Sequence, residues 1–224
     1  MQYLEISLNI IANQITGTSN VALAMKYGIA PKGTMAHELF MVMSGVMHGS
    51  DDEIRSSHNR VLQEWWNEYG FDLSVALTDT YGSNFFFKDM TLEQARNWKG
   101  LRQDSGSPAA FAEKQIDFYK ERQIDPRKKL FVPSDGLDVP LMIRLKDQTR
   151  GRILNGPGWG TNATNDLGLV PLSLVVKAVE ANGHGTVKLS DNPAKATGSP
   201  EDKARFMRIF EYNPKDYTEQ ECVY

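Results

Sequence analysis

The chain alternates between short apolar runs that end in polar or glycine-rich residues and longer segments with helical periodicity. The apolar runs, predicted as strands with their terminal clusters, are residues 28–38, 73–83, 99–108, 128–138 and 151–162. Most are followed by a predicted helix, namely 35–46, 91–98, 107–123 and 139–149. One long helix is predicted over 48–70, because Ser50 and two aspartates form a capping start. Runs at 172–183 and 186–193 continue the alternation.

Strand–helix alternation with apolar strands is typical of parallel α/β folds. The polar residues Asp79, Asp104, Asp135 and Thr161 lie 25, 31 and 26 residues apart, which fits strand–helix–strand units of about 30 residues. In a (β/α) barrel the carboxyl ends of the strands meet at one mouth, where ligands bind. We therefore predict a barrel. An open doubly wound sheet is the alternative, and it is disfavoured because no G-x-G-x-x-G turn follows the first run.

Composition narrows the class of partner. The chain has 224 residues, enough for one large domain or two small ones, and its net charge is −3. This balance gives no general attraction to nucleic acid or anionic membranes, so any anionic ligand must be held by a local site. No apolar run approaches the 18 or so residues that span a bilayer. Cys222 is the only cysteine, so no intrachain disulfide can form, and a reducing, intracellular setting is favoured.

His37 is the first candidate for chemistry. It follows Gly33-Thr34 at the predicted mouth, with Glu38 beside it as an orienting partner. An imidazole can carry a proton, bind a metal or act as a nucleophile near neutral pH. A structural histidine at the start of an apolar helix is the other interpretation. His48, His58 and His184 lack such surroundings and are predicted to be surface or loop residues.

Further candidates stand at the ends of later strands. Arg102, close to Asp104, suits bidentate capture of a carboxylate or phosphate, although a surface ion pair would use the same residues. The glycine turns 134–136 and 156–162 could cradle a phosphate with backbone N–H groups, although glycine is also common in ordinary turns. Asp79, Asp104 and Asp135 offer carboxylates to Mg²⁺. No H-E-x-x-H or paired-cysteine spacing indicates zinc.

Aromatic clusters are assigned to packing. The run Phe85-Phe86-Phe87 is predicted to be core rather than a stacking platform for bases, and Trp65-Trp66 is predicted to pack the long helix.

Six segments in order resemble the nicotinate phosphoribosyltransferase family. They are GTSNVALAMKYGIAPKGTMAHE, LTDTYGSNFFFKD, GLRQDSGSP, SDGLDV, GTNATND and KLSDNPAK, and together they extend from Gly17 to Lys195. The resemblance implies a type II phosphoribosyltransferase with an irregular barrel. It also implies the reaction of nicotinate with phosphoribosyl pyrophosphate to give nicotinate mononucleotide, on the route to NAD. In that family ATP phosphorylates a histidine, and ATP hydrolysis drives the coupling.

The resemblance assigns roles residue by residue. His37 becomes the phosphate acceptor, with Glu38 beside it as a second catalytic residue, while Thr34 and Arg102 match positions that contact nicotinate. Thr161, with Gly160, matches a position that contacts the mononucleotide product. Asp104, Ser134, Asp135 and Gly136 are further expected substrate contacts, and Asp104 and Asp135 are the expected Mg²⁺ ligands. The substrates implied are nicotinate, phosphoribosyl pyrophosphate and ATP, in the cytoplasm, with the nucleus as a second compartment.

Departures from the family pattern set the alternatives. The family has an acidic residue where Ser107 stands, and NGPGW is an unusual approach to the phosphate turn. Family chains are longer at the N-terminus, so we expect residues 1–16 to be an atypical segment and 17–224 to be an incomplete barrel domain. The absent part would supply an α/β domain, an arginine-rich segment and an aromatic residue that crosses a homodimer. Two alternatives therefore remain open: a catalytically incompetent fragment that acts only by association, and a nicotinamide-specific enzyme. Quinolinate enzymes do not use a phosphorylated histidine, so the histidine block argues against them.

Overall fold

The computed structural model describes residues 16–160 and 174–218. The chain divides into two compact units, Met1–Thr34 and Met35–Tyr224. In the first, helix α2 (Val21–Tyr27) begins at Asn20, whose side chain accepts from the Leu23 amide, and ends at Gly28 in the left-handed conformation (φ 65°). The first apolar run is not a sheet strand: its β contact is one isolated parallel bridge between Thr18 and Pro31. The predicted boundary after residue 16 stays a prediction.

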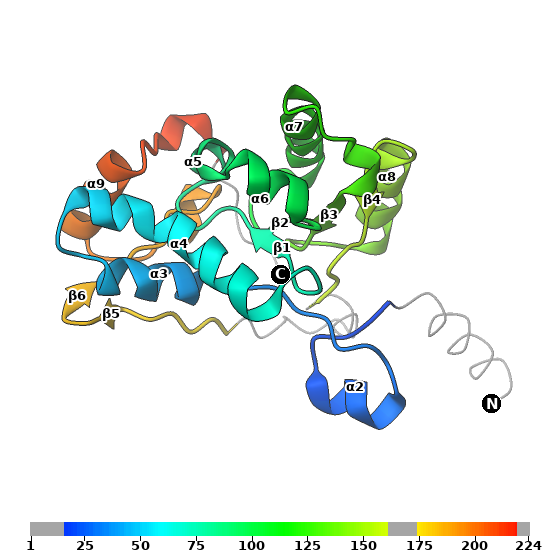
Figure 1. Ribbon diagram of the computed structural model, residues 1–224, viewed down its shortest axis with the longest axis horizontal. Helices are drawn as coiled ribbons and strands as arrows, with labels where there is room; N and C mark the ends of the chain where they lie inside the picture. Colours follow the sequence, from blue (N-terminus) through cyan, green and yellow to red (C-terminus); the bar gives the residue numbers. More distant parts are fainter. Residues whose placement is uncertain (1–15, 161–173, 219–224) are drawn as a thin grey trace, which may run out of the picture. The chain divides into compact units, whose positions relative to one another are not determined.

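The second unit is built on a parallel sheet of four strands in the order β1-β2-β3-β4 (Figure 1). The strands are β1 (Val75–Leu77), β2 (Gly100–Gln103), β3 (Leu130–Pro133) and β4 (Leu154–Asn155). Sequence order equals spatial order, so each crossover moves one strand along the sheet, as in a (β/α) barrel. The strand–helix alternation is confirmed. Within the described residues the sheet is open, which agrees with the prediction of an incomplete barrel.

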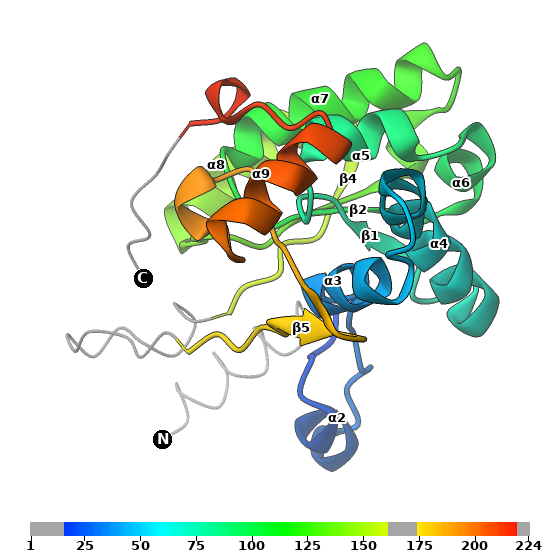
Figure 2. The ribbon, with the colours of Figure 1, turned by 90° about the vertical axis from the view of Figure 1, so that its left-hand side faces the viewer.

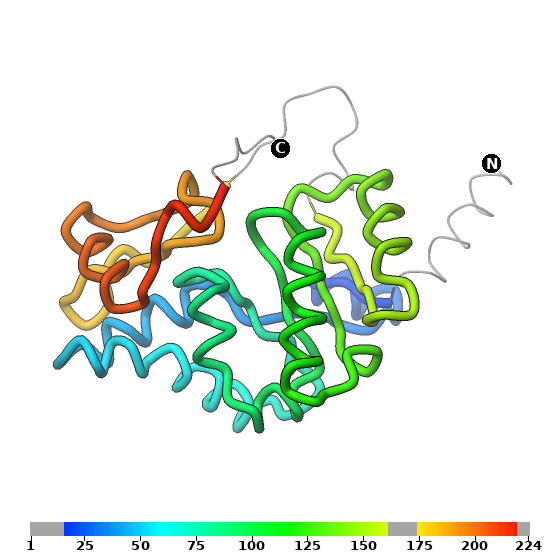
Figure 3. The backbone as a smooth tube through the Cα atoms, turned by 90° about the horizontal axis from the view of Figure 1, so that it is seen from above, coloured from blue at the N-terminus to red at the C-terminus, as the bar shows by residue number. Residues whose placement is uncertain are grey.

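The α-helices described in the second unit are α3 (His37–Val46), α4 (Asp51–Tyr69), α5 (Ser83–Asp89), α6 (Leu92–Asn97), α7 (Pro108–Glu121), α8 (Val139–Thr149) and α9 (Pro200–Ile209). Helices α3, α4, α6, α7 and α8 lie where the sequence pattern predicts them, whereas α5 and α9 were not predicted. Ser50 caps α4 as predicted, and Ser107 caps α7 by accepting from the Ala110 amide. Serine caps a helix about as well as aspartate does, which explains how Ser107 can stand where the family has an acidic residue. Helices α3 and α4 pack together (Figure 2), and α7 covers β2 and β3 beside α8 (Figure 3).

The late runs differ from the prediction. Residues 174–179 form no strand, and the following residues make a short antiparallel hairpin of β5 (Glu180–Ala181) and β6 (His184–Gly185). Its turn, Asn182-Gly183, has positive φ at both positions (52° and 77°), the conformation for which Asn-Gly is favoured in two-residue hairpins. Residues 186–193 add only an isolated bridge, from Lys188 to Thr197. The alternation therefore ends at β4 in the described part of the chain.

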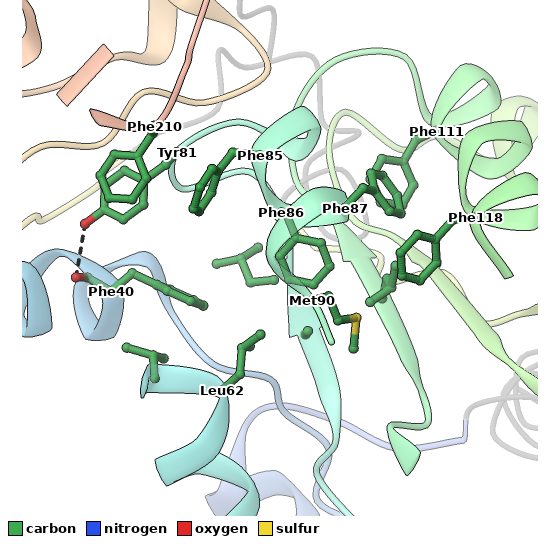
Figure 4. Close-up of a cluster of buried hydrophobic side chains, with 14 of the residues drawn as sticks. Phe40, Leu62, Tyr81, Phe85, Phe86, Phe87, Met90, Phe111, Phe118 and Phe210 are labelled. Atoms are coloured by element: carbon green, nitrogen blue, oxygen red, sulfur yellow. Dashed lines mark hydrogen bonds between the residues drawn. The ribbon is translucent and has the colours of Figure 1, made fainter. Parts of the chain in front are cut away.

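The core lies between the sheet and its helices (Figure 4). Phe85, Phe86 and Phe87 are all buried in it, as predicted, and Trp65 and Trp66 pack against it from α4. The prediction for His58 is wrong. His58 is 1% exposed because its position on α4 faces inward; its ring stacks on Phe40, and its Nδ1 lies 2.6 Å from Asp89 Oδ2, which accepts the hydrogen bond.

Among the described residues, no helix combines the length and the apolar character that crossing a bilayer requires.

Candidate active site

His37 opens helix α3 and is almost completely buried, with 4% of its surface exposed. Its Nδ1 lies 3.0 Å from Thr80 Oγ1, and its Nε2 lies 3.0 Å from Asp104 Oδ2. Thr80 follows strand β1 and Asp104 follows β2, so two parallel strands deliver the side chains that hold the ring. Their carboxyl ends meet at the same edge of the sheet, which is where the chain was predicted to gather its polar residues.

Glu38 does not hold the histidine ring. Its carboxylate forms an ion pair with Lys177 Nζ at 2.9 Å. Both ring nitrogens of His37 already have other partners, so the residue that orients the ring is Asp104 and not Glu38. Adjacent residues on a helix point in different directions, about 100° apart, which explains why a neighbour in sequence is a poor guide here.

Asp104 joins the imidazole to the guanidinium. Its Oδ1 accepts from Arg102 Nη2 at 2.8 Å while its Oδ2 faces His37. Ser134 Oγ accepts from Arg102 Nε and donates toward Asp104 Oδ1, both at 2.9 Å. Burial on its own would raise the pKa of Asp104, but the hydrogen bond from His37 and the positive charge of Arg102 hold that pKa well below its usual range. The carboxylate is therefore ionised across the neutral range.

A second, deeper carboxylate stands behind the first. Asp79, directly after β1, is 1% exposed, and its Oδ2 accepts from Ser105 Oγ at 2.5 Å, with Ser190 Oγ 3.2 Å away. Its Oδ1 has no hydrogen-bond partner and lies 3.7 Å from His37 Nε2. Two carboxylates therefore face the same edge of the imidazole.

The remaining predicted residues fall into three groups. Asp135 forms an ion pair with Lys195 Nζ at 2.7 Å, and Gly136 beside it has a left-handed conformation (φ 59°). Gly160 is exposed at the end of the described segment, and Thr161 lies outside the described residues. Thr34 is half-buried and belongs to the first unit.

Mg²⁺ does not fit the predicted pair of ligands. Both oxygens of Asp104 already accept hydrogen bonds, and Asp135 is paired with an ammonium group. Among the described residues, the cluster whose potential ligand atoms lie within 4.8 Å of one another consists of His37, Asp79 and Asp104, without Asp135. A site of one imidazole and few open oxygens is poor for a hard cation that prefers oxygen.

Sequence reasoning missed several members of the site. Thr80, Ser105 and Lys195 were not singled out, although each stands within two residues of a strand-end cluster or inside a recognised segment. Ser190 and Lys177 come from the part of the chain where the predicted alternation fails. The imidazole and the guanidinium, which are 65 residues apart in the chain (37 to 102), share one carboxylate, and this convergence makes phosphoryl or glycosyl transfer chemically feasible at the sheet edge.

Comparisons with known proteins identify the family of this chain. Residues 2–214 match the nicotinate phosphoribosyltransferase (NAPRTase) family. The structure is similar to nicotinate phosphoribosyltransferase from Vibrio cholerae, with 34% identity and a TM-score of 0.87 over 94% of this chain. It is also similar to nicotinate phosphoribosyltransferase from Porphyromonas gingivalis, with 35% identity and a TM-score of 0.80 over 88% of this chain.

In both comparisons the chain covers 51% of the other protein, so it spans about half the length of these solved structures. The family match, the shared architecture and the histidine–carboxylate–arginine cluster at the strand ends lead to one conclusion: the chain belongs to the nicotinate phosphoribosyltransferase family.

Proposed function

We propose that this chain carries the catalytic histidine of a nicotinate phosphoribosyltransferase. The enzyme would join nicotinate to phosphoribosyl pyrophosphate, forming nicotinate mononucleotide for NAD synthesis in the cytoplasm, with ATP hydrolysis driving the reaction. The observation that carries the proposal is the placement of His37. Its ring is held between Thr80 and Asp104 and shares the Asp104 carboxylate with Arg102.

The arrangement supports phosphorylation of His37 by ATP. An ionised carboxylate at Nε2 keeps a hydrogen on that nitrogen and offsets the positive charge that the ring gains when the other nitrogen bonds to phosphorus. Adding a phosphoryl group brings negative charge and strong acceptors, which can reorganise nearby loops. Mg²⁺ enters the proposal as the ion bound to the substrate phosphates, because the carboxylates of Asp104 and Asp135, the predicted ligands, are already engaged.

Arg102 is the proposed cation for the carboxylate of nicotinate. Its guanidinium stands at the rim, 26% exposed, and is oriented by Asp104 and Ser134. Guanidinium groups bind carboxylates through paired hydrogen bonds, which favours the acid over the amide of the same ring. Departure of pyrophosphate leaves positive charge on the ribose, and the Asp104 carboxylate is the proposed group that stabilises it. Ser134, Asp135 and Gly136 are proposed contacts for the ribose or its phosphate.

Phosphate trapping tests the proposal. The chain is incubated with ATP labelled in the γ-phosphoryl group, and acid-labile, base-stable protein phosphate is measured in the wild type, His37→Ala and His184→Ala. We expect labelling of the wild type and of His184→Ala, whose ring is exposed, and none of His37→Ala. A folded wild-type chain that takes up no such phosphate would contradict the proposed mechanism.

Product formation separates the enzyme from a fragment that acts only by association. Nicotinate mononucleotide is assayed with the chain alone, with nicotinate or nicotinamide as the competing substrate, while its mass in solution is measured by light scattering. Turnover of nicotinate by the chain supports the proposal. Phosphorylation without turnover would restrict this chain to the first half of the reaction, with the second half requiring a partner such as the second subunit of a homodimer.

A further inference from the structure

The two ring nitrogens of His37 face groups with different hydrogen-bonding capacity. Nε2 has Asp104 Oδ2 at 3.0 Å and Asp79 Oδ1 at 3.7 Å, and ionised carboxylates can only accept. A neutral imidazole has a single N–H, so that hydrogen must lie on Nε2. Nδ1 then keeps its lone pair, and the Thr80 hydroxyl, 3.0 Å away, must be the donor to it.

The Thr80 hydroxyl occupies this lone pair. Thr80 is 1% exposed, and its Oγ1 is the hydrogen-bond partner of His37 Nδ1. The backbone of Thr80 is fixed, because its carbonyl accepts from the Leu189 amide at 2.7 Å. The side chain can therefore leave Nδ1 only by rotation about its Cα–Cβ bond, and in threonine this rotation is restricted to a few staggered positions.

We propose that Thr80 is a positioning residue that caps the nucleophilic nitrogen of His37, releases it for attack on ATP, and then donates its hydrogen bond to the transferred phosphoryl group. This inference rests on the proposed function. It assigns a task to a hydroxyl that the fold places against the ring, and it predicts which nitrogen reacts.

The step balances without any other reactant. The Nδ1 lone pair forms the N–P bond to the γ-phosphorus of ATP. The bond from that phosphorus to the bridging oxygen breaks, and its electron pair leaves on ADP. The hydrogen on Nε2 stays in its bond to Asp104, whose negative charge offsets the charge gained by the ring. The Thr80 hydrogen turns from Nδ1 to a phosphoryl oxygen, which is a stronger acceptor.

The first test needs no ATP. The chain is labelled with ¹⁵N-histidine, and the His37 signals are assigned by their loss in His37→Gln. In mildly alkaline buffer the wild type should show a hydrogen-bearing Nε2 and an unprotonated, hydrogen-bonded Nδ1. Thr80→Val has the same shape without the hydroxyl, so its Nδ1 signal should move to higher chemical shift, toward a free imine nitrogen. Thr80→Ser keeps the hydroxyl and should restore the wild-type position. A wild-type ring with its hydrogen on Nδ1 would overturn the inference.

The second test measures the phosphorylated enzyme. Losing one hydrogen bond to the phosphoryl group should reduce the equilibrium amount of phosphohistidine in Thr80→Val by about 2- to 10-fold at limiting ATP. Thr80→Ser should recover most of it. Equal phosphorylation of wild type, Thr80→Val and Thr80→Ser would refute the role of the hydroxyl, and so would a loss in Thr80→Val that Thr80→Ser does not reverse.

The two tests separate this inference from the proposed function. If the wild type takes up no phosphate, the proposed function fails, while the tautomer and its response to Thr80→Val still decide whether Thr80 caps Nδ1. If the wild type is phosphorylated but Nδ1 carries the hydrogen at rest, the proposed function stands and the role of Thr80 fails. If Thr80→Val does not fold, Thr80→Ser and the wild-type spectrum still decide.

Discussion

Asp191 is a buried carboxyl group whose ionisation should weaken the folded state near neutral pH. It is 8% exposed, and its Oδ1 accepts from the Ser83 amide at 2.7 Å. Burial and the negative charge of Asp79 raise the pKa of Asp191 from 3.8 to about 7, although the Ser83 hydrogen bond and Lys114 act in the opposite direction. Because the folded pKa is higher than the unfolded one, the stability is complete below about pH 4 and is lost as the pH rises through about 7.

The size of the effect follows from this difference. A pKa that moves from 3.8 to about 7 corresponds to at most about 4 kcal/mol in the free energy of unfolding, at 1.36 kcal/mol for each pKa unit. Asp191→Asn keeps an oxygen toward the Ser83 amide and removes the charge. The variant should therefore match the wild type near pH 4 and be more stable near pH 8, by an amount on the order of kcal/mol.

Urea unfolding between about pH 4 and pH 8 measures this difference directly. Asp117→Asn is the matched control, because it makes the same substitution at a side chain that is 64% exposed on α7. The gap between Asp191→Asn and the wild type should open as the pH rises, while the control follows the wild type. Parallel curves for all three proteins would refute the reasoning, since they would mean that Asp191 ionises without opposition from its surroundings.

Three further changes test the packing of the second unit. Gly100→Ala should lower the free energy of unfolding by at least about 2 kcal/mol, because its new Cβ would collide with the Leu130 carbonyl oxygen of the neighbouring strand. An unchanged urea midpoint would exclude this close approach. Phe86→Ala should lower it by about 3–5 kcal/mol, since the ring is completely buried, and thermal unfolding measures the loss. Glu113→Gln should remove the contribution of its ion pair with Arg152 to the free energy of unfolding. That contribution should be below about 1 kcal/mol, because the Glu113 side chain is 43% exposed and the Arg152 side chain is 40% exposed. The hydrogen bonds from Arg152 lower the pKa of Glu113 to about 2, so this stability is present above about pH 4.5 and is lost as the pH falls toward 2. Acid unfolding curves that coincide for the wild type and Glu113→Gln would contradict this prediction.

The sequence by itself determined the local structure of most of the second unit. Helix α4 begins where the Ser50 cap predicts, and α8 covers the predicted residues 139–149. Capping residues and the spacing of apolar side chains act within one or two turns, so they can be read without knowing the rest of the chain. The regular spacing of strand ends also predicted a parallel sheet correctly, because each crossover needs a helix of similar length.

The tertiary structure decided which of these residues touch. Glu38, next to His37 in sequence, turns to Lys177, while Thr80 and Asp104, 43 and 67 residues away, hold the ring. His58 was expected at the surface, yet it lies in the aromatic core. Hydrogen-bond partners across a sheet edge depend on which strands lie side by side and how far each extends, and neither quantity is encoded locally.

The same distinction explains where the strand prediction failed. The residues after β4 contain valines and leucines with strand-like composition, but β propensity only becomes a strand when a neighbouring strand accepts its hydrogen bonds. In the described part of the chain residues 174–179 belong to no strand, although the Val179 carbonyl accepts from the Thr186 amide at 3.1 Å, and the Asn182-Gly183 turn folds the next residues back on themselves. Composition determined which segments could pair, and three-dimensional proximity determined which ones did.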